Sequence, residues 1–256
     1  MDFRKIFDTI PEEFDRWRPR YCPELFADLA EYGQLGPGKE VLEVGPGTGQ
    51  ATEPVLRTGC SYTAIELGEH LTEFMKKRFR EYGNFRIVNG DFETYDFGEQ
   101  KFDMVYSAAA FQWIPQEIGY PKAWELLKEG GAFAMFLMRP DARPGGGYTD
   151  EPLYSRIQQV YDRYFHPEVE YRCSLDYDAR SRYGFTDLEY REYPFVREFD
   201  TESYLSYIAT HSDHQTLREP DKSRFYQGIR EAIDSCGGKM TMYNKFVLYL
   251  GRKASV

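Results

Sequence analysis

Hydrophobic residues in the first part of the chain alternate between short continuous runs and helix-spaced stripes. Short apolar runs, bounded by glycine, proline or polar residues, predict strands at 40–44, 61–66, 85–89, 102–107 and 132–138. A helix over 69–82 is predicted by Leu71, Phe74, Met75 and Phe79, with Gly83 as its stop. Strands that alternate with helices predict parallel βαβ units and a Rossmann-like, doubly wound α/β sheet.

The flanking segments lack this regular rhythm. Residues 1–36 are expected to be helical, with breaks at Pro11, Pro19 and Pro23. A further helix is predicted from Pro121 to Lys128, with a stop at Gly130-Gly131.

Beyond Met138 a loop or hinge, Arg139 to Gly147, precedes a mixed region. Helices are predicted there at 151–165, 201–211 and 222–236, and strands at 187–195 and 243–250. The chain therefore divides into a helical arm (1–36) that covers a site, a core (37–138), and a last part (139–256) of remaining strands and a helical lid.

A glycine turn follows the first predicted strand. Gly45, Gly47 and Gly49 stand directly after Val41-Leu42-Glu43-Val44 and before a short helical pattern that ends at Gly59. Glycines let a backbone approach a nucleotide closely. The dinucleotide fingerprint G-x-G-x-x-G needs glycine at position 50, where the chain has Gln50. The spacing is E-x-G-x-G-x-G instead, which argues against a nicotinamide-dependent oxidoreductase.

The acid Glu43 sits two residues before the first glycine, and no Lys or Arg occurs between Val41 and Leu56. A phosphate site uses a helix N-terminus and usually a basic side chain. Glu43 is instead expected to hold a cationic amino group, directly or through water. This arrangement resembles motif I of the class I S-adenosylmethionine-dependent methyltransferases.

Two further acids stand at predicted strand ends. Glu66 ends the second strand and is expected to accept hydrogen bonds from two ribose hydroxyls. Asp91 follows the third strand and is expected to accept from an adenine amine, with Phe92 packed on the ring. Glu43, Glu66 and Asp91 are expected to face one crevice at the carboxyl ends of the strands.

The amino-acid composition of the chain limits the kinds of partner that we expect. The 256 residues carry a net charge of −10, which argues against nucleic acid as the main partner. Cys22, Cys60, Cys173 and Cys236 are too far apart for a metal site and are expected to be free, mostly buried thiols. The N-terminus lacks the apolar core of a signal peptide, and the apolar run 132–138 is too short to span a bilayer. We expect a cytoplasmic protein, monomer or homodimer, without a membrane partner or a metal.

Residues 14–136 resemble the small-molecule branch of the class I methyltransferases, most closely the trans-aconitate methyltransferases. Three segments carry the resemblance beyond the glycine turn: FDRWRPRY at 14–21, AAAFQWI at 108–114 and THSDHQTL at 210–217. Phe14 replaces the family's first Tyr, and Gln112 replaces its usual His. The resemblance implies a seven-stranded sheet with an antiparallel last strand, and transfer of a sulfonium methyl group to a small acceptor.

The expected cofactor, S-adenosylmethionine, needs a large set of contacts. The residues assigned to it are Arg18, Tyr21, Glu43, Gly45, Gly47, Gly49, Glu66, Leu67, Asp91, Phe92, Ala108 and Trp113.

Methyl transfer from a sulfonium is an in-line displacement that mainly requires alignment and exclusion of water. A base is needed only if the acceptor must lose a proton. The candidates for a catalytic group are Tyr21, Gln112 and His211, with His214 close by in sequence. Arg139 and Arg143 could bind a carboxylate acceptor or merely solvate the hinge. A non-catalytic, cofactor-binding regulatory module remains the alternative, because fold alone does not fix function.

Overall fold

A single sheet of seven strands, in the order β3-β2-β1-β4-β5-β7-β6, organises the computed structural model, which describes residues 2–141, 147–169 and 173–254. The strands are β1 (Glu40–Val44), β2 (Ser61–Glu66), β3 (Phe85–Asn89), β4 (Phe102–Ala108), β5 (Leu127–Pro140), β6 (Phe185–Asp200) and β7 (Lys239–Lys253). The first five strands pair in parallel, whereas β7 runs antiparallel to both β5 and β6. The predicted doubly wound, seven-stranded sheet with an antiparallel last strand is confirmed.

Helices cover both faces of the sheet, because β1, β2 and β4 are apolar on both sides. One face packs against α2 (Pro23–Gly33), α3 (Thr52–Leu56) and α4 (Glu69–Arg78) around Tyr62 and Tyr106. The other face packs against α5 (Gln116–Leu126) and the 3₁₀ helix η3 (Tyr177–Tyr183) around Phe133. The short 3₁₀ helix η2 (Phe111–Trp113) follows β4.

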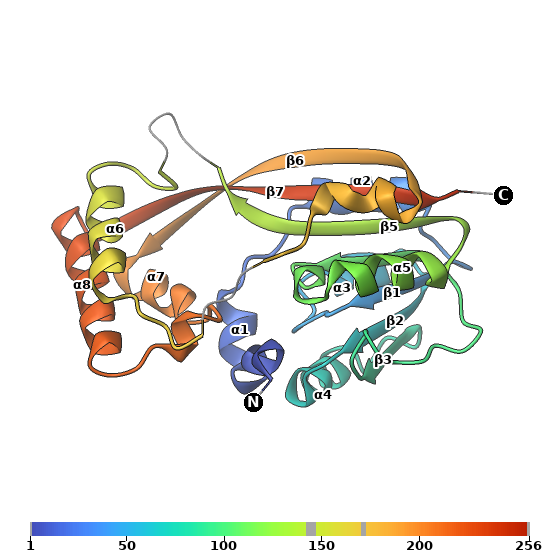
Figure 1. Cartoon of the computed structure of the whole chain (residues 1–256), viewed down its shortest axis with the longest axis horizontal. Helices are drawn as coiled ribbons and strands as arrows, with labels where there is room; N and C mark the ends of the chain where they lie inside the picture. Colours follow the sequence, from blue (N-terminus) through green and yellow to red (C-terminus); the bar gives the residue numbers. More distant parts are fainter. Residues whose placement is uncertain (1, 142–146, 170–172, 255–256) are drawn as a thin grey trace.

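The three strands β5, β7 and β6 extend well beyond the others and carry a second apolar core (Figure 1). This core joins α6 (Leu153–Tyr164), α7 (Thr201–Ile208) and α8 (Asp221–Ser235) to the strands through Met240 and Met242. The 3₁₀ helix η4 (His214–Thr216) lies after α7. The excess of helix expected in the last part of the chain therefore gathers at one end of the long strands.

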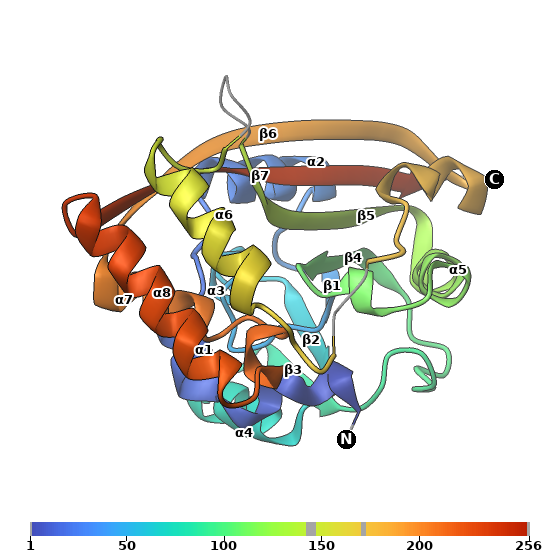
Figure 2. The ribbon, with the colours of Figure 1, turned by 60° about the vertical axis from the view of Figure 1, so that its left-hand side comes forward.

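The N-terminal arm lies between the two cores (Figures 1 and 2). The first two elements of the arm are the 3₁₀ helix η1 (Phe3–Thr9) and α1 (Pro11–Trp17). Helix α1 contacts α4 on the sheet side and α7 on the other side. Pro11 and Pro23 occupy first helical turns, where a missing N–H costs no hydrogen bond, so they start helices as well as separating them.

The predicted helix at 121–128 was wrong in its bounds. Helix α5 begins at Gln116 and contains Pro121 in its interior. Its expected stop, Gly130-Gly131, lies inside β5 instead, where the pairing with β4 shifts register between Phe102 and Met104. Gly130 has a φ of +71°, so the glycines form a bulge in a strand. Sequence alone does not distinguish this use of glycine from a helix stop.

Other differences are smaller. Helix α4 ends at Arg78, before the predicted 82, and β6 and β7 are longer than predicted at both ends. The expectation of mostly buried thiols was wrong: Cys60 is buried, Cys22 and Cys236 are half-buried, and Cys173 is exposed. Arg143, Gly145 and Gly146 of the predicted hinge lie outside the described residues. In the described part of the chain, no helix is both long and apolar enough to cross a membrane.

Candidate functional site

One cavity of about 720 Å³ runs from the carboxyl ends of the parallel strands to the helices of the second core. Twelve residues singled out from the sequence line it: Arg18, Tyr21, Gly45, Gly47, Glu66, Leu67, Asp91, Phe92, Ala108, Gln112, Trp113 and His211. They come from the arm, from four strand ends and from the segment after α7. Residues that are far apart in the chain therefore meet at the crevice that an open α/β sheet provides.

The glycine turn adopts left-handed backbone conformations. Gly45, Gly47 and Gly49 have φ values of +68°, +60° and +89°. Gly49 does not line the cavity, unlike the other two. A Cβ at Gly49 would lie 2.6 Å from the ring of Phe79, so this glycine lets the turn pack onto α4. Gly49 thus supports the turn from behind the cavity wall.

Glu66 lies where the sequence predicts it, at the end of β2 and in the cavity wall. Its Oε2 accepts from the backbone nitrogen of Gly47 at 3.1 Å, and its Oε1 accepts from that of Gly68 at 2.9 Å. Burial raises the pKa of the Glu66 carboxyl to about 7. The carboxylate joins the glycine turn to the second strand and has lone pairs left for a ligand.

Glu43 does not line the cavity, in contrast to the expectation that it faces the crevice. Side chains alternate along a strand, and Glu43 points to the face on which Tyr62 and Tyr106 lie. Its Oε2 accepts from Thr52 Oγ1 at 2.5 Å and from the Tyr62 hydroxyl. Burial raises its pKa to about 7. The carboxylate braces the start of α3 behind the glycine turn.

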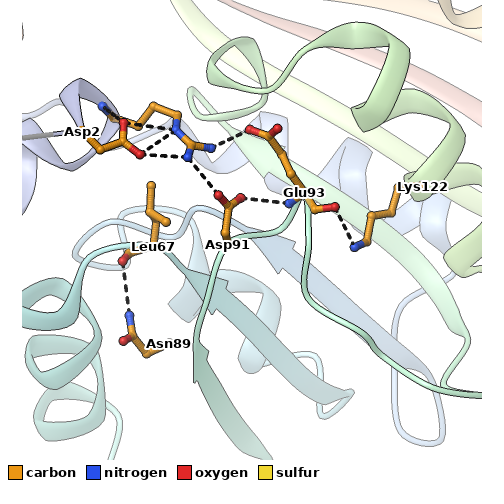
Figure 3. A network of polar contacts seen from close by, with 7 residues as sticks. Asp2, Leu67, Asn89, Asp91, Glu93 and Lys122 are labelled. Carbon is orange, nitrogen blue, oxygen red and sulfur yellow. Dashed lines mark hydrogen bonds and ion pairs between the residues drawn. The ribbon is translucent and has the colours of Figure 1, made fainter.

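Asp91 is held by the N-terminal arm (Figure 3). Its Oδ2 accepts from Arg4 at 2.9 Å, and its Oδ1 accepts from the backbone nitrogen of Glu93 at 3.0 Å. Arg4 also pairs with Glu93 at 2.5 Å and with Asp2 at 2.8 Å. Arg4 itself lines the cavity, so the arm is tied down beside the acid assigned to the adenine.

Asn89 fixes the backbone next to these acids. Its Nδ2 donates to the carbonyl oxygen of Glu66 at 3.0 Å. It also donates to that of Leu67 at 3.3 Å (Figure 3). Leu67 and Glu66 therefore keep their places in the cavity wall. The sequence reasoning missed Asn89 and Arg4; an arginine in the arm gave no signal, because its partners are almost ninety residues away.

Arg18 and Tyr21 line the middle of the cavity. The Arg18 guanidinium lies over the rings of Phe7 and Phe14, at 5.4 and 5.1 Å from their centroids. It donates to the backbone oxygen of Thr210 at 3.1 Å, and burial lowers its pKa. Phe14 lies beside Gly47, so Arg18 is linked to the glycine turn. Tyr21 packs edge-on against Phe136.

The far end of the cavity is built from aromatic residues of the second core. Its lining residues there include Tyr148, Gln158, Tyr161, Tyr204, Tyr207, Met242 and Asn244. We call this end the tyrosine chamber. The chain has 21 tyrosines, and which of them line this end depends on how α6, α7 and β7 come together.

The two histidines after α7 differ. His211 lines the cavity, and burial together with Arg18 lowers its pKa well below the usual value. His214 does not line it; its Nε2 lies 3.1 Å from the hydroxyl of Tyr161, and burial lowers its pKa to about 3. His211 is therefore a neutral imidazole at the cavity, and His214 is part of the core.

Of the remaining candidates, Gln112 lies at the cavity and Arg139 lies away from it. Gln112 lines the cavity, and its Nε2 donates to the backbone oxygen of Ala109 at 2.9 Å. Arg139 lies over the rings of Tyr177 and Tyr249, away from the cavity. Within the described ranges, no group of three or more His, Cys, Asp or Glu side chains is placed to hold a metal ion.

Comparison with known proteins agrees with this geometry. Residues 41–131, which hold the glycine turn, Glu66 and Asp91, match a family described as a methyltransferase domain. A demethylmenaquinone methyltransferase of Tropheryma whipplei is 28% identical over 145 residues, which cover 51% of this chain and 56% of that protein. A ribosomal RNA small subunit methyltransferase A of Malacoplasma penetrans is 34% identical over 172 residues, 61% of each chain. The chain thus spans little more than half the length of these relatives.

The fold is similar to those of solved methyltransferase structures. The structure of a Haemonchus contortus phosphoethanolamine N-methyltransferase 2 with S-adenosyl-L-methionine superposes with a TM-score of 0.57 at 14% identity. The match covers 100% of this chain and 60% of that one. At this identity the superposition shows a shared fold, and the match to the methyltransferase-domain family is confined to residues 41–131 of this chain.

Proposed function

We propose that the protein transfers the methyl group of S-adenosylmethionine to a small-molecule acceptor by in-line displacement. The observation that carries the proposal is the continuity of the cavity, which joins the glycine turn to the tyrosine chamber. A displacement needs donor and acceptor in one space, aligned and shielded from water. The cavity provides space for the donor at the glycine turn and for the acceptor in the tyrosine chamber, and the two spaces are continuous.

The cofactor would lie along the strand ends. Glu66 would accept from the ribose hydroxyls, and Asp91 would accept from the adenine amine, with Phe92 against the ring. The turn at Gly45 and Gly47 would let the backbone approach. The buried Arg18, which forms no ion pair within the described residues, would take the methionine carboxylate.

The N-terminal arm and helices α6–α8 would act as covers on the two sides of the cavity. Arg4, Phe7, Phe14 and Arg18 of the arm line it, and so do Tyr161 and Tyr207 of the helices. This supports the division into arm, core and lid. Because both covers form part of the cavity wall, at least one of them must move to admit substrates.

A small molecule fits the site better than RNA. Some relatives act on ribosomal RNA by name, but this chain has 42 acidic against 32 basic residues. A nucleic-acid backbone is bound through basic clusters. The acceptor end of the cavity is covered by helices and lined by tyrosines. The segment FDRWRPRY at 14–21 supports, as the finer proposal, the branch that resembles trans-aconitate methyltransferases.

His211 is the best placed group to take a proton from the acceptor. It lines the cavity as a neutral imidazole, whereas Gln112 cannot accept a proton at neutral pH and burial raises the pKa of Tyr21 well above its usual value. Acceptors that are already nucleophilic would need no base.

The alternative, a non-catalytic module that only binds the cofactor, would use the same cavity without an acceptor. A two-part experiment separates these functions. Calorimetry with S-adenosylhomocysteine and with NAD tests the cofactor, and we expect micromolar binding of the former only. The protein is then incubated with methyl-labelled S-adenosylmethionine and separate small-molecule and RNA fractions of a cell extract. Label in the small-molecule fraction supports the proposal; label in RNA alone, or tight binding without any transfer, contradicts it.

A further inference from the structure

Asn244 is a polar residue in an apolar row. Along one face of β7 lie Met240, Met242, Asn244, Phe246 and Leu248, all of them buried. Asn244 is only 2% exposed and is the single polar member of this row. Burying an amide among apolar neighbours costs free energy of folding, so the presence of Asn244 here needs an explanation.

The amide of Asn244 has no hydrogen-bond partner among the described residues. Neither Nδ2 nor Oδ1 of Asn244 is bonded to any of the residues 2–141, 147–169 and 173–254. Buried polar side-chain atoms are nearly always paired, so two unpaired atoms on one side chain point to a missing ligand. Asn244 lines the cavity, where such a ligand can reach it.

The position of Asn244 indicates that this ligand is the methyl acceptor rather than the cofactor. Asn244 pairs with Pro140 of β5, whereas Ala108 at the cofactor crevice is level with Phe136 of the same strand. Four residues of strand correspond to about 13 Å, so Asn244 lies well beyond the strand ends that would hold the cofactor. Its neighbours in the wall are Met242 and Tyr148, whose carbonyl accepts from the nitrogen of Tyr243 at 2.9 Å.

We propose, resting on the function proposed above, that Asn244 selects the acceptor by binding a neutral group that both donates and accepts hydrogen bonds. A carboxylate would satisfy Nδ2 and leave Oδ1 unpaired, and an ammonium would do the reverse. A hydroxyl or a carboxamide satisfies both atoms of the amide. The acceptor therefore carries such a group at the end remote from the glycine turn, among the tyrosines.

The first test needs no ligand. Asn244→Leu removes two unpaired buried polar atoms at similar volume, so the variant should melt at or above the temperature of the wild type. The matched control is Asn84→Leu, because Asn84 Nδ2 donates to the carbonyl oxygens of Cys60 at 2.8 Å and Leu56 at 3.3 Å. That variant should melt at a lower temperature. If Asn244→Leu loses as much stability as Asn84→Leu, the Asn244 amide is structural and the proposal is overturned.

The second test measures recognition with small aromatic probes that fit a tyrosine-lined chamber. Phenol, benzamide, benzoate and toluene are titrated by NMR into the complex with S-adenosylhomocysteine. Phenol or benzamide should bind about tenfold tighter than toluene to the wild type, and this preference should vanish in Asn244→Leu. Whichever of phenol and benzamide binds more tightly identifies the group on the acceptor as a hydroxyl or a carboxamide. Equal binding of toluene, tighter binding of benzoate, or a preference that survives in Asn244→Leu overturns the proposal.

Binding of S-adenosylhomocysteine separates this inference from the function on which it rests. Asn244→Leu should bind that cofactor product within about twofold of the wild type, because Asn244 lies outside the cofactor end. If the wild type itself does not bind S-adenosylhomocysteine, the proposed function fails. If the wild type binds it normally and the probes show no preference, only the role of Asn244 fails.

Discussion

The carboxylate of Glu66 accepts a hydrogen bond from the backbone nitrogen of Gly47 at 3.1 Å. This bond joins the end of β2 to the turn after β1. It also means that the acid assigned to the ribose helps to shape the loop assigned to the rest of the cofactor. Changes at Glu66 should therefore affect binding by two routes, through a lost ligand contact and through a looser turn.

Glu66→Ala should weaken S-adenosylhomocysteine binding far more than Glu69→Ala. Glu69 is exposed at the start of α4 and serves as the control. A lost hydrogen bond to a charged group costs about 1.5–3 kcal/mol, which is roughly tenfold or more in affinity. Isothermal titration calorimetry on both variants measures the difference. Small and equal losses would mean that the ribose lies elsewhere.

The stability of the protein should depend on pH through Glu43. Burial raises its pKa from 4.5 to about 7, so the folded state keeps a proton that the unfolded state has lost over this range. The contribution of Glu43 to stability is then full below pH 4.5 and falls as pH rises to about 7. Glu43→Gln cannot ionise, so relative to wild type it should gain up to about 3 kcal/mol between pH 5 and pH 8.

Urea denaturation of Glu43→Gln and wild type at both pH values measures this gain, with Glu69→Gln as the exposed control. A free-energy difference that stays constant with pH would show that Glu43 keeps an ordinary pKa in the folded protein.

Arg4→Gln should loosen the N-terminal arm over the cavity. Arg4 joins the arm to Asp91 and Glu93 through partly buried ion pairs. The substitution removes this whole network of pairs. Hydrogen exchange in 3–17 should become faster, and S-adenosylhomocysteine should protect this segment less than in the wild type. Arg16→Gln, at an exposed position of the same arm, is the control. Unchanged exchange in Arg4→Gln would show that the arm is held by its apolar contacts alone.

Gly49→Ala should destabilise the fold although Gly49 does not line the cavity. Its φ is +89°, and a Cβ there would lie 2.6 Å from Phe79 and 2.9 Å from the Met75 sulfur. The left-handed backbone costs about 1–2 kcal/mol for alanine and the overpacking about 1–3 kcal/mol. A Cβ at Gly83 meets nothing within 4 Å, so Gly83→Ala is the control. Similar denaturation midpoints for the two variants would contradict the packing role.

Local patterns determined the parallel half of the sheet and much of the cofactor end. Strands β1, β2 and β3 lie at the predicted residues because each is a short, mainly apolar run with polar or glycine boundaries. Glu66 and Asp91 reach the cavity because a strand end in a parallel sheet always opens toward the same edge. These features depend on neighbours in sequence, which a linear pattern records.

Only the tertiary structure decided which way Glu43 faces and what the acceptor end contains. Glu43 turns away because alternation along β1 and the hydroxyl of Tyr62 place it on the opposite face of the sheet. Arg4 meets Asp91 across 87 residues, and Asn244 meets the tyrosines through a register between β5 and β7. That the Asn244 amide is unpaired among the described residues is visible only in three dimensions, once its neighbours have positions. Such pairings depend on strand order and register, since those decide which distant side chains share a wall.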